Sequence, residues 1–374
     1  MKSERTAALV LMAAAFAGLV LANSPVGANF LDFKHSYLGF ESLGLNLSIE
    51  HWVSDLLLAT FFLVAGLELK YELRSGVLSK PATAMVPIVA ALGGVVVPAL
   101  IYVAFNLGTD GLRGWPIPTA TDIAFALGVL AIFGRGLPKQ ARIFLLALAI
   151  FDDLIAILII AVFFTSDLNV GWLVAAGAVA LLHLLAERTK KLPMNLVRII
   201  SFLVLWYLVL QSGVHPTIAG VTLGLLIPAR KAHGLIDKIQ PWTNNLVLPL
   251  FAFFAAGIAL PSFASEGSGV FLGVLVGLPL GKILGITAFA LLANQIANRE
   301  SRMELKAPDF FALSALAGVG FTVSLLMAKL AFEDYQELAA EATLGVILGS
   351  VISMTIGAVI AQSRARYYRR LQNQ

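Results

Sequence analysis

The stretch LLALAIFDDLIAILIIAVFF, residues 145–164, decides the fold. A helix of about 20 apolar residues crosses the hydrocarbon core of a bilayer, and this stretch has that length. Two neighbouring aspartates, Asp152 and Asp153, lie at its centre. Each aspartate costs roughly 2.5–3.5 kcal/mol to place there, and acids inside a membrane are functional by default. The stretch therefore predicts a transmembrane helix that carries an acidic site.

The composition extends this prediction to the whole chain. Of the 374 residues, 59% are hydrophobic and 13% are charged, and the mean hydropathy is +0.88. These values are typical of an all-α, polytopic membrane protein and exclude a soluble domain. The absence of cysteine excludes disulfides and thiolate metal sites. We expect residues 1–374 to form a single integral membrane domain.

Hydropathy predicts about twelve transmembrane spans. Their limits are 6–22, 52–69, 81–106, 114–134, 141–164, 170–187, 198–212, 214–229, 245–260, 268–294, 308–330 and 338–361. The first resembles a signal peptide, but we interpret it as a span because many more spans follow it. Short connections rich in Gly, Pro, Asn or Asp separate the others.

The basic residues predict the orientation of the chain. Nearly all of the 26 lysines and arginines fall on one side if the N-terminus is cytoplasmic, as the positive-inside rule requires. The exceptions are Lys34, Arg113, Lys282 and Lys329. Both termini, including the tail 362–374, are then cytoplasmic. The pI of 9.3 reflects this topology, so we expect no binding of nucleic acid.

The longest external connection is residues 23–51. In SYLGFESLGLNLSIEHW, residues 36–52, bulky and polar residues partly alternate around Gly44. This pattern predicts a small extracytoplasmic β-hairpin, and its exposed edge can pair with a second copy to form a homodimer. An irregular loop is the alternative.

The aspartate pair predicts a site for cations and protons. Neighbouring residues on a helix point about 100° apart, so Asp152 and Asp153 can border one cavity. Carboxylates bind hard cations such as Na⁺ or Li⁺, and they bind protons. Lys282, in GLPLGKILGITAF (277–289), is the one basic residue at mid-membrane depth and is expected to pair with one of these acids. The alternative is a purely structural group of charges.

Two other spans are interrupted by residues that disfavour a continuous helix. They are Pro118, Thr121 and Asp122 in PTATDIAFALG (118–128), and Gly318, Gly320 and Thr322 in LAGVGFTVSLL (316–326). Interrupted spans at corresponding positions of two inverted halves mark the substrate site of a transporter, and spans 3–5 and 10–12 are the expected halves. Asp122 is expected to face the positive half-helix ends, and Lys282 the negative ones. For the glycines alone, close helix packing is the alternative.

GLELKYEL, residues 66–73, forms the cytoplasmic end of the second span. It places Glu68 and Glu72 on one helix face with Lys70 between them. This arrangement predicts an acidic mouth that gathers cations and responds to pH, although a solvated helix end is the alternative. His215, at an external helix junction, is a second candidate for sensing pH.

Six segments together resemble one known family, the NhaA family of bacterial sodium/proton antiporters. They are ATDIAFALGVLA, FLLALAIFDDL, QSGVHPTIAGV, LPLFAFFAAGI, LGKILGI and AGVGFTVSLLMA. The resemblance covers essentially the whole chain. It implies a protein of the bacterial inner membrane that transports Na⁺, Li⁺ and H⁺, lies among membrane lipids and needs no cofactor.

The resemblance also implies roles for particular residues. Asp152 and Asp153 form the ion and proton site, and Lys282 is the essential lysine. Asp122, with Thr121, lies where two broken helices, spans 4 and 11, cross.

The acidic segment with Glu68, Lys70 and Glu72 corresponds to the pH-regulating funnel of the family. The chain departs from the family here, since Tyr71 replaces a residue that is often basic and LIDKIQPW (235–242) lacks the usual Glu and His.

We therefore expect an antiporter that exchanges cytoplasmic Na⁺ or Li⁺ for external H⁺ by competition at the aspartate pair. The exchange is expected to be electrogenic and pH-regulated. A sodium-coupled symporter of organic solutes is the main alternative. An intramembrane aspartyl protease would use Asp122 and Asp152 as acid and base, but no Gly-x-Gly-Asp motif is present. A cation channel is the third alternative, although channels seldom bury a lysine beside their acids.

Overall fold

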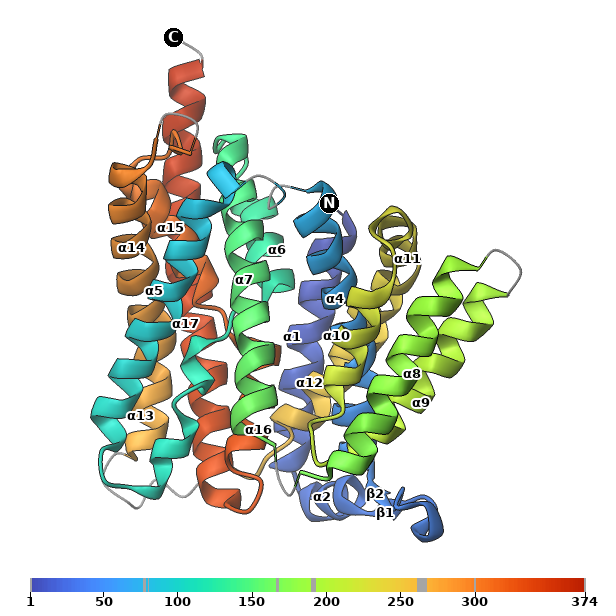
Figure 1. The fold of residues 1–374 in the computed structure, drawn as a ribbon. Helices are drawn as coiled ribbons and strands as arrows, with labels where there is room; N and C mark the ends of the chain where they lie inside the picture. The colour runs from blue at the N-terminus through green and yellow to red at the C-terminus, as the bar shows by residue number, and fades with distance from the viewer. Residues whose placement is uncertain are drawn as a thin grey trace.

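The computed structural model describes residues 2–76, 79, 81–165, 168–189, 193–260, 268–298 and 301–372. Long helices stand side by side, as expected of an all-α membrane protein (Figure 1). Both termini lie towards the upper end of the view, and a small hairpin lies at the lower end.

The α-helices have the following bounds: α1 (Lys2–Ala22), α2 (Gly27–His35), α3 (Ile49–His51), α4 (Leu58–Ser75), α5 (Pro81–Asn106), α6 (Ile123–Phe133), α7 (Lys139–Phe163), α8 (Val170–Arg188), α9 (Met194–Gln211), α10 (Thr217–Leu226), α11 (Ala229–Trp242), α12 (Leu248–Ala256), α13 (Gly269–Val276), α14 (Lys282–Ile296), α15 (Ala307–Ala317), α16 (Phe321–Ala331) and α17 (Gln336–Gln372). The shorter elements are β1 (Tyr37–Leu38), β2 (Leu47–Ser48), the 3₁₀ turns η1 (Glu41–Leu43), η4 (Asp110–Gly114) and η5 (Ile117–Thr119), and the π-helical turns η2 (Trp52–Leu57), η6 (Thr243–Val247) and η7 (Gly277–Gly281).

Each predicted span overlaps at least one of these helices. Within the described residues, seven helical segments are long and apolar enough to cross a membrane, and the number is ten if each of three bent helix pairs counts as one span. The twelve-span arrangement and its inverted repeat stay predictions.

Several predicted boundaries were wrong. The eighth span was placed at 214–229, but α10 has only 10 residues. The next connection was taken as a loop ending in a span at 245–260, whereas α11, η6 and α12 form one helical run. Pro241 lies inside α11, just before the π-helical turn η6.

The tail 362–374 is helical as far as Gln372, because α17 continues past the end of the predicted span at 361. Arg364 Nε donates to Asp309 Oδ1 over 2.8 Å, and the Tyr368 hydroxyl donates to Asp309 Oδ2 over 2.7 Å. These bonds fasten the last turns of α17 to the start of α15.

The predicted hairpin is confirmed, although a helix precedes it. β1 pairs with β2 in antiparallel register, with Tyr37 opposite Ser48 and Leu38 opposite Leu47. Gly44 lies in the connection with φ +63°, a left-handed conformation that favours glycine. The preceding residues form α2, which was not predicted.

The helices pack as two groups that alternate along the chain. The first helix group consists of residues 2–76 and 168–260, where α4 packs on α10 and α11, α1 on α12, and α8 on α9. The second helix group consists of residues 81–165 and 268–372, where α5 packs on α7, α13 and α14, and α15 packs on α17. The groups meet where α1 contacts α6, α12 contacts α16 and α4 contacts α7.

Small residues bring α5 and α14 into close contact inside the second helix group. A Cβ on Gly285 would lie 2.1 Å from the Gly93 carbonyl oxygen, and one on Gly281 would lie 2.6 Å from the Pro98 Cα atom. Helix association in membranes relies on such close approach of backbones. The crossing fixes Lys282, which lies between the two glycines and is fully buried.

Candidate functional site

Two broken helices meet in the middle of the second helix group. The segment Asp110–Thr119 is bent by 42° from α6, and α15 is bent by 50° from α16. The interruptions predicted at these two places are confirmed. The Asp122 backbone N–H donates to the Val319 carbonyl oxygen over 2.6 Å, so the two breaks are in direct contact.

Asp122 joins the starts of α6 and α16. Its Oδ1 accepts a hydrogen bond from the Phe125 backbone N–H over 3.2 Å, which caps α6. Its Oδ2 accepts from the Thr322 hydroxyl over 2.6 Å and from the Thr322 backbone N–H over 3.2 Å. Helix N-termini carry partial positive charge, so this buried carboxylate lies against two positive ends.

Asp152 lies on α7 beside the breaks. Its Oδ2 accepts from Lys282 Nζ over 2.7 Å, and the Thr121 hydroxyl lies 2.6 Å from the same oxygen. The Thr121 hydroxyl also lies 2.7 Å from the Ala317 carbonyl oxygen at the end of α15, and 3.0 Å from Lys282 Nζ. A hydroxyl has one hydrogen, so Thr121 donates to one of these two oxygens at a time and accepts from Lys282.

The sequence left open which aspartate Lys282 pairs with, and the recorded partner is Asp152. Lys282 was also expected to face a negative helix end. In the structure it reaches the end of α15 through Thr121, whose hydroxyl contacts the Ala317 carbonyl.

The second oxygen of Asp152 and the carboxylate of Asp153 accept no hydrogen bond that is recorded between described residues. Asp152 Oδ1 is buried and has no hydrogen-bond partner within the described part of the chain. Asp153 is the next residue on α7 and is 8% exposed, and no hydrogen bond to it is recorded among the described residues. The charged groups that act on it are Asp152, Glu68, Asp122 and Lys282. Buried carboxylate oxygens without donors are suited to bind a proton or a small cation.

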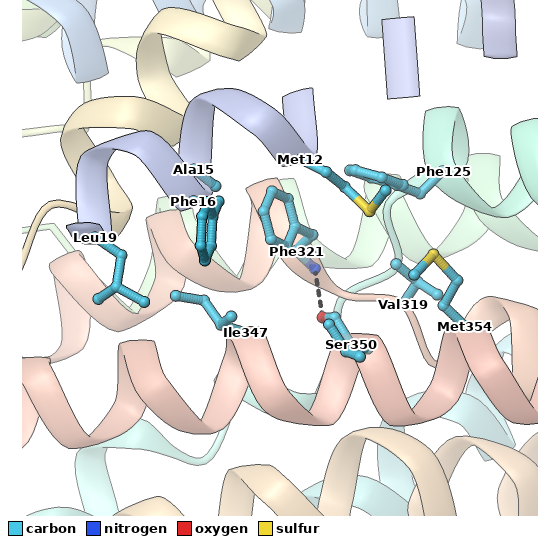
Figure 2. A pocket seen from close by; sticks show the side chains of 11 residues that line it. Met12, Ala15, Phe16, Leu19, Phe125, Val319, Phe321, Ile347, Ser350 and Met354 are labelled. Carbon is cyan, nitrogen blue, oxygen red and sulfur yellow. Dashed lines mark hydrogen bonds between the residues drawn. The ribbon is translucent and has the colours of Figure 1, made fainter. Parts of the chain in front are cut away.

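An apolar cavity of about 250 Å³ lies next to the breaks but is not part of this site (Figure 2). It is bounded by α1 and α17 and by Phe125, Val319 and Phe321 from the two breaks. Ser350 is the polar residue among the described side chains that line it, and its hydroxyl accepts from the Phe321 backbone N–H over 3.2 Å. Such a lining does not replace the hydration shell of an ion.

Comparison with known proteins gives the family. Residues 1–361 match the family described as Na⁺/H⁺ antiporter 1. The Na(+)/H(+) antiporter NhaA 2 of Clavibacter michiganensis subsp. michiganensis is 47% identical, and the match covers 99% of this chain and 92% of that protein. The chain belongs to the NhaA family of Na⁺/H⁺ antiporters. The antiporter NhaA of Mycolicibacterium smegmatis, at 43% identity over 99% of this chain and 88% of its own length, is a further relative.

Membership of the NhaA family decides between the functions that the sequence left open. The protein is a Na⁺/H⁺ antiporter, which is a transporter and not an enzyme. It is a multi-pass protein of the bacterial plasma membrane, and Na⁺ and H⁺ are the transported ions. The symporter, protease and channel alternatives are set aside.

The predicted funnel residues lie at the end of α4 that is distant from the hairpin. Glu68 Oε1 accepts from the Gln240 side-chain amide over 3.1 Å, which links α4 to α11. Tyr71 stacks on His233, with ring centroids 5.6 Å apart. The segment that lacks the family's Glu and His thus contacts Glu68 through a neutral amide. Lys70 and Glu72 lie half-buried on the same helix end.

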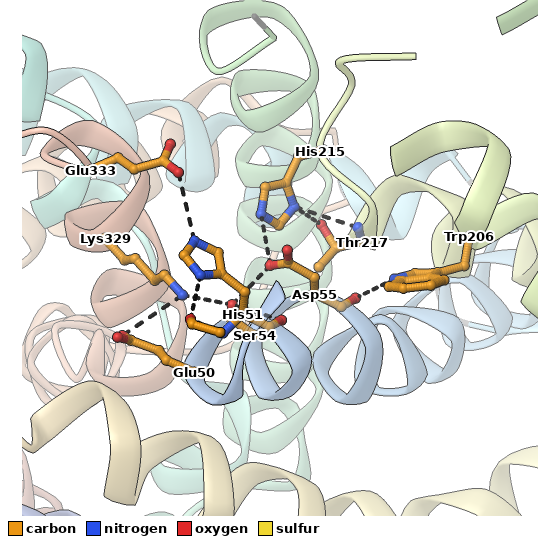
Figure 3. A network of polar contacts seen from close by, with 10 residues as sticks. Glu50, His51, Ser54, Asp55, Trp206, His215, Thr217, Lys329 and Glu333 are labelled. Carbon is orange, nitrogen blue, oxygen red and sulfur yellow. Dashed lines mark hydrogen bonds and ion pairs between the residues drawn. The ribbon is translucent and has the colours of Figure 1, made fainter. Parts of the chain in front are cut away.

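His215 lies far from the funnel, near the opposite end of α4. Its Nδ1 lies 2.7 Å from the Thr217 hydroxyl, and its Nε2 lies 3.8 Å from Asp55 Oδ1 (Figure 3). His215 is outside the long helices, and burial lowers the pKa of its imidazole. The two groups of predicted pH-sensing residues are therefore not in contact with each other.

Sequence reasoning missed a charged cluster that is linked to this histidine through Asp55 and Ser54. Glu50 and Lys329 face each other from α3 and α16, and Lys34 of α2 faces Glu50. A signal was present, because Lys34 and Lys329 are two of the four basic residues outside the predicted cytoplasmic segments. Lysines at these positions are unusual under the positive-inside rule, so acidic partners could have been sought for them.

Proposed function

We propose that Asp152 and Asp153 form one site in which Na⁺ or Li⁺ competes with protons. The observation that supports this most directly is the buried Asp152 Oδ1, which lacks a hydrogen-bond donor, beside the buried Asp153. A cation with these two carboxylates as ligands requires both to be deprotonated. Protons that return to the carboxylates remove the charge that holds the cation, so binding of one excludes the other.

Lys282 holds the place of the cation when the site is empty. Its ammonium occupies one oxygen of Asp152 at 2.7 Å, in a location that is fully buried. A lone charge there is costly, and the pair neutralises itself. When Na⁺ binds Asp152, Lys282 loses its counter-ion and releases a proton. We expect Lys282→Gln to lose this contribution, and full electrogenic antiport by that variant would contradict the role.

The cycle exposes the site alternately to the two sides of the membrane. Na⁺ enters from the cytoplasmic end, past Glu68 and Glu72, and leaves at the end that carries β1 and β2. The twelve-span inverted repeat, with both termini cytoplasmic, brings the two broken helices together at the site, and the first and second helix groups rock relative to each other about it. An empty, charged site reorients slowly because bare carboxylates at mid-membrane are costly, and this couples the two fluxes.

More than one proton exchanges for each Na⁺ in this scheme, so the cycle moves net charge. The membrane potential then contributes about 2.3 kcal/mol per charge per 100 mV to the expulsion of sodium. Regulation by pH through Glu68, Lys70, Glu72 and His215 belongs to the same proposal. So does a homodimer joined through residues 23–51, where Tyr37 and Phe40 are exposed.

Asp152→Asn and Asp153→Asn test the proposal. Sodium-induced collapse of a proton gradient is followed in everted vesicles between about pH 6 and pH 9. Each variant is expected to lose most of the response even at saturating sodium, because the amide neither binds a proton nor offers a second anionic oxygen. Asp110→Asn, at an exposed acid of η4, is the matched control and should respond as the wild type does. Normal exchange by both site variants would refute the proposal.

A further inference from the structure

A cluster of charged side chains lies at the hairpin end of the molecule (Figure 3). Glu50 is at its centre, 3.3 Å from Lys34 Nζ and 3.7 Å from Lys329 Nζ. The three side chains are only 15%, 6% and 17% exposed, respectively. One carboxylate thus balances two lysines in a mostly buried location, where an unpaired charge is costly.

Lys329 reaches this cluster from the last turn of α16. Its Nζ also donates to the Ser54 hydroxyl over 2.8 Å, and Ser54 donates to Asp55 over 2.8 Å. Glu333 lies just beyond α16, and its Oε1 is 3.7 Å from His51 Nε2. The hydrogen bond with the His51 imidazole holds the pKa of Glu333 below its usual value. These contacts extend the polar cluster from α16 to α3 and to the π-helical turn η2.

The contacts of Lys329 and Glu333 join the two helix groups. Lys329 and Glu333 belong to the second helix group, whereas Glu50, His51 and Ser54 belong to the first. Among pairs in which both residues are described, every recorded hydrogen bond or ion pair between the groups lies in this cluster. Elsewhere the groups meet through helix faces such as those of α12 and α16, where no such bond between two described residues is recorded.

The cluster lies between the ion site and one end of the molecule. α16 begins at the break, where Thr322 holds Asp122, and Lys329 follows two turns later. At 1.5 Å per residue, the lysine is roughly 10 Å further along the helix. The helix that contacts the ion site therefore also carries the lysine that binds the other group.

We propose that Lys329 and Glu333, bound to Glu50, Ser54 and His51, form an extracytoplasmic latch that holds the two helix groups together and opens once in each transport cycle. The inference rests on the alternating exposure proposed above. Apolar helix faces can slide past each other in small steps, but an ion pair is either made or broken. The latch therefore gives the outer end two distinct states.

Cross-linking tests whether the latch has to open. The chain has no cysteine of its own, so Glu50→Cys with Lys329→Cys supplies two unique thiols. A short, reducible bifunctional thiol reagent then ties the groups together. Sodium-driven collapse of the proton gradient should fall at least about tenfold and should return when a reductant cleaves the link.

The matched control is Glu50→Cys with Lys34→Cys, because both residues lie in the first helix group. The same reagent should leave its exchange within about twofold of the untreated variant. Exchange that persists in the fully cross-linked Glu50–Lys329 variant would overturn the latch. It would leave the antiport proposal intact, because the exchange itself is the measured signal.

A second measurement tests the closed latch in protein that has not been cross-linked. Ser54→Cys places a thiol behind Lys329, and a membrane-impermeant maleimide is applied from the hairpin side. Adding Lys329→Gln should speed the labelling by about two- to fivefold, the range expected for loss of one ion pair. Adding Lys34→Gln removes a pair at similar distance within one group, and should not speed the labelling. Equal acceleration by both substitutions would contradict the latch.

Discussion

Thr121 carries one hydroxyl that serves three neighbours. It lies within 3.0 Å of Asp152, Lys282 and the Ala317 carbonyl oxygen. The hydroxyl thus connects the ion site to the end of a broken helix. At the scale of single residues, the site depends on a few such side chains whose hydrogen bonds can be exchanged when the cation arrives.

Thr121→Val keeps the shape of this side chain and removes the hydroxyl. One buried donor is lost, which costs about 1–3 kcal/mol. We expect the sodium concentration for half-maximal antiport to rise roughly tenfold. Thr121→Ser keeps the hydroxyl and should behave like the wild type. Equal sodium dependence of the Val and Ser variants would show that the hydroxyl plays no part in binding.

Asp122→Asn removes the charge that faces the starts of α6 and α16. The amide keeps one acceptor oxygen but offers no negative charge to the two helix dipoles. We expect a loss of about 2 kcal/mol in the free energy of unfolding, measured by thermal denaturation of the purified protein in detergent. An unchanged melting temperature would contradict the role of Asp122 as the link between the breaks.

At the scale of elements, the close packing of α5 on α14 can be tested by substituting a glycine at their crossing. Gly285→Leu would place a side chain where the Gly93 carbonyl lies 2.1 Å from the new Cβ. The helices have to separate, which displaces Lys282 and costs about 1–3 kcal/mol. Gly177→Leu is the control, because a Cβ on Gly177 of α8 meets nothing within 4 Å. The melting temperature and the antiport rate should fall only in the first variant.

Some helices and helix breaks were predictable from the sequence, and others were not. The breaks were predictable, since proline, glycine and threonine in an apolar run disfavour a continuous helix. The helical run from α11 to α12 was missed because residues 230–244 are polar enough to be taken as a connection between two spans, although they form a helix. Contacts across helices depend on tertiary packing: the sequence indicated that Lys282 pairs with one of the two aspartates, but it did not connect Lys329 with Glu50.

At the scale of the whole molecule, His215 can affect the pH dependence of stability and the pH dependence of antiport, and the two effects can be measured separately. Burial lowers the pKa of its imidazole below the usual value, so the neutral form is favoured in the folded state. The charged groups around it are Asp55, Lys329, Glu333 and His51. As pH falls below about 6.5, the unfolded chain binds a proton here more readily than the folded one, and stability declines.

His215→Gln should remove this decline, so the melting temperature of the variant should fall less than that of the wild type between about pH 7 and pH 5. Above about pH 7 the imidazole is neutral in both states, so regulation of antiport by His215 acts below this pH and the variant should keep the alkaline part of the antiport profile. A shifted alkaline profile would instead assign His215 a direct role in activation.

The account as a whole depends on competition between sodium and protons for one pair of buried carboxylates. The most direct measurement adds sodium to the purified protein in weakly buffered solution and records the protons released. The wild type should release protons in proportion to the sodium bound, and Asp153→Asn should release fewer. Sodium binding without any proton release would contradict the account.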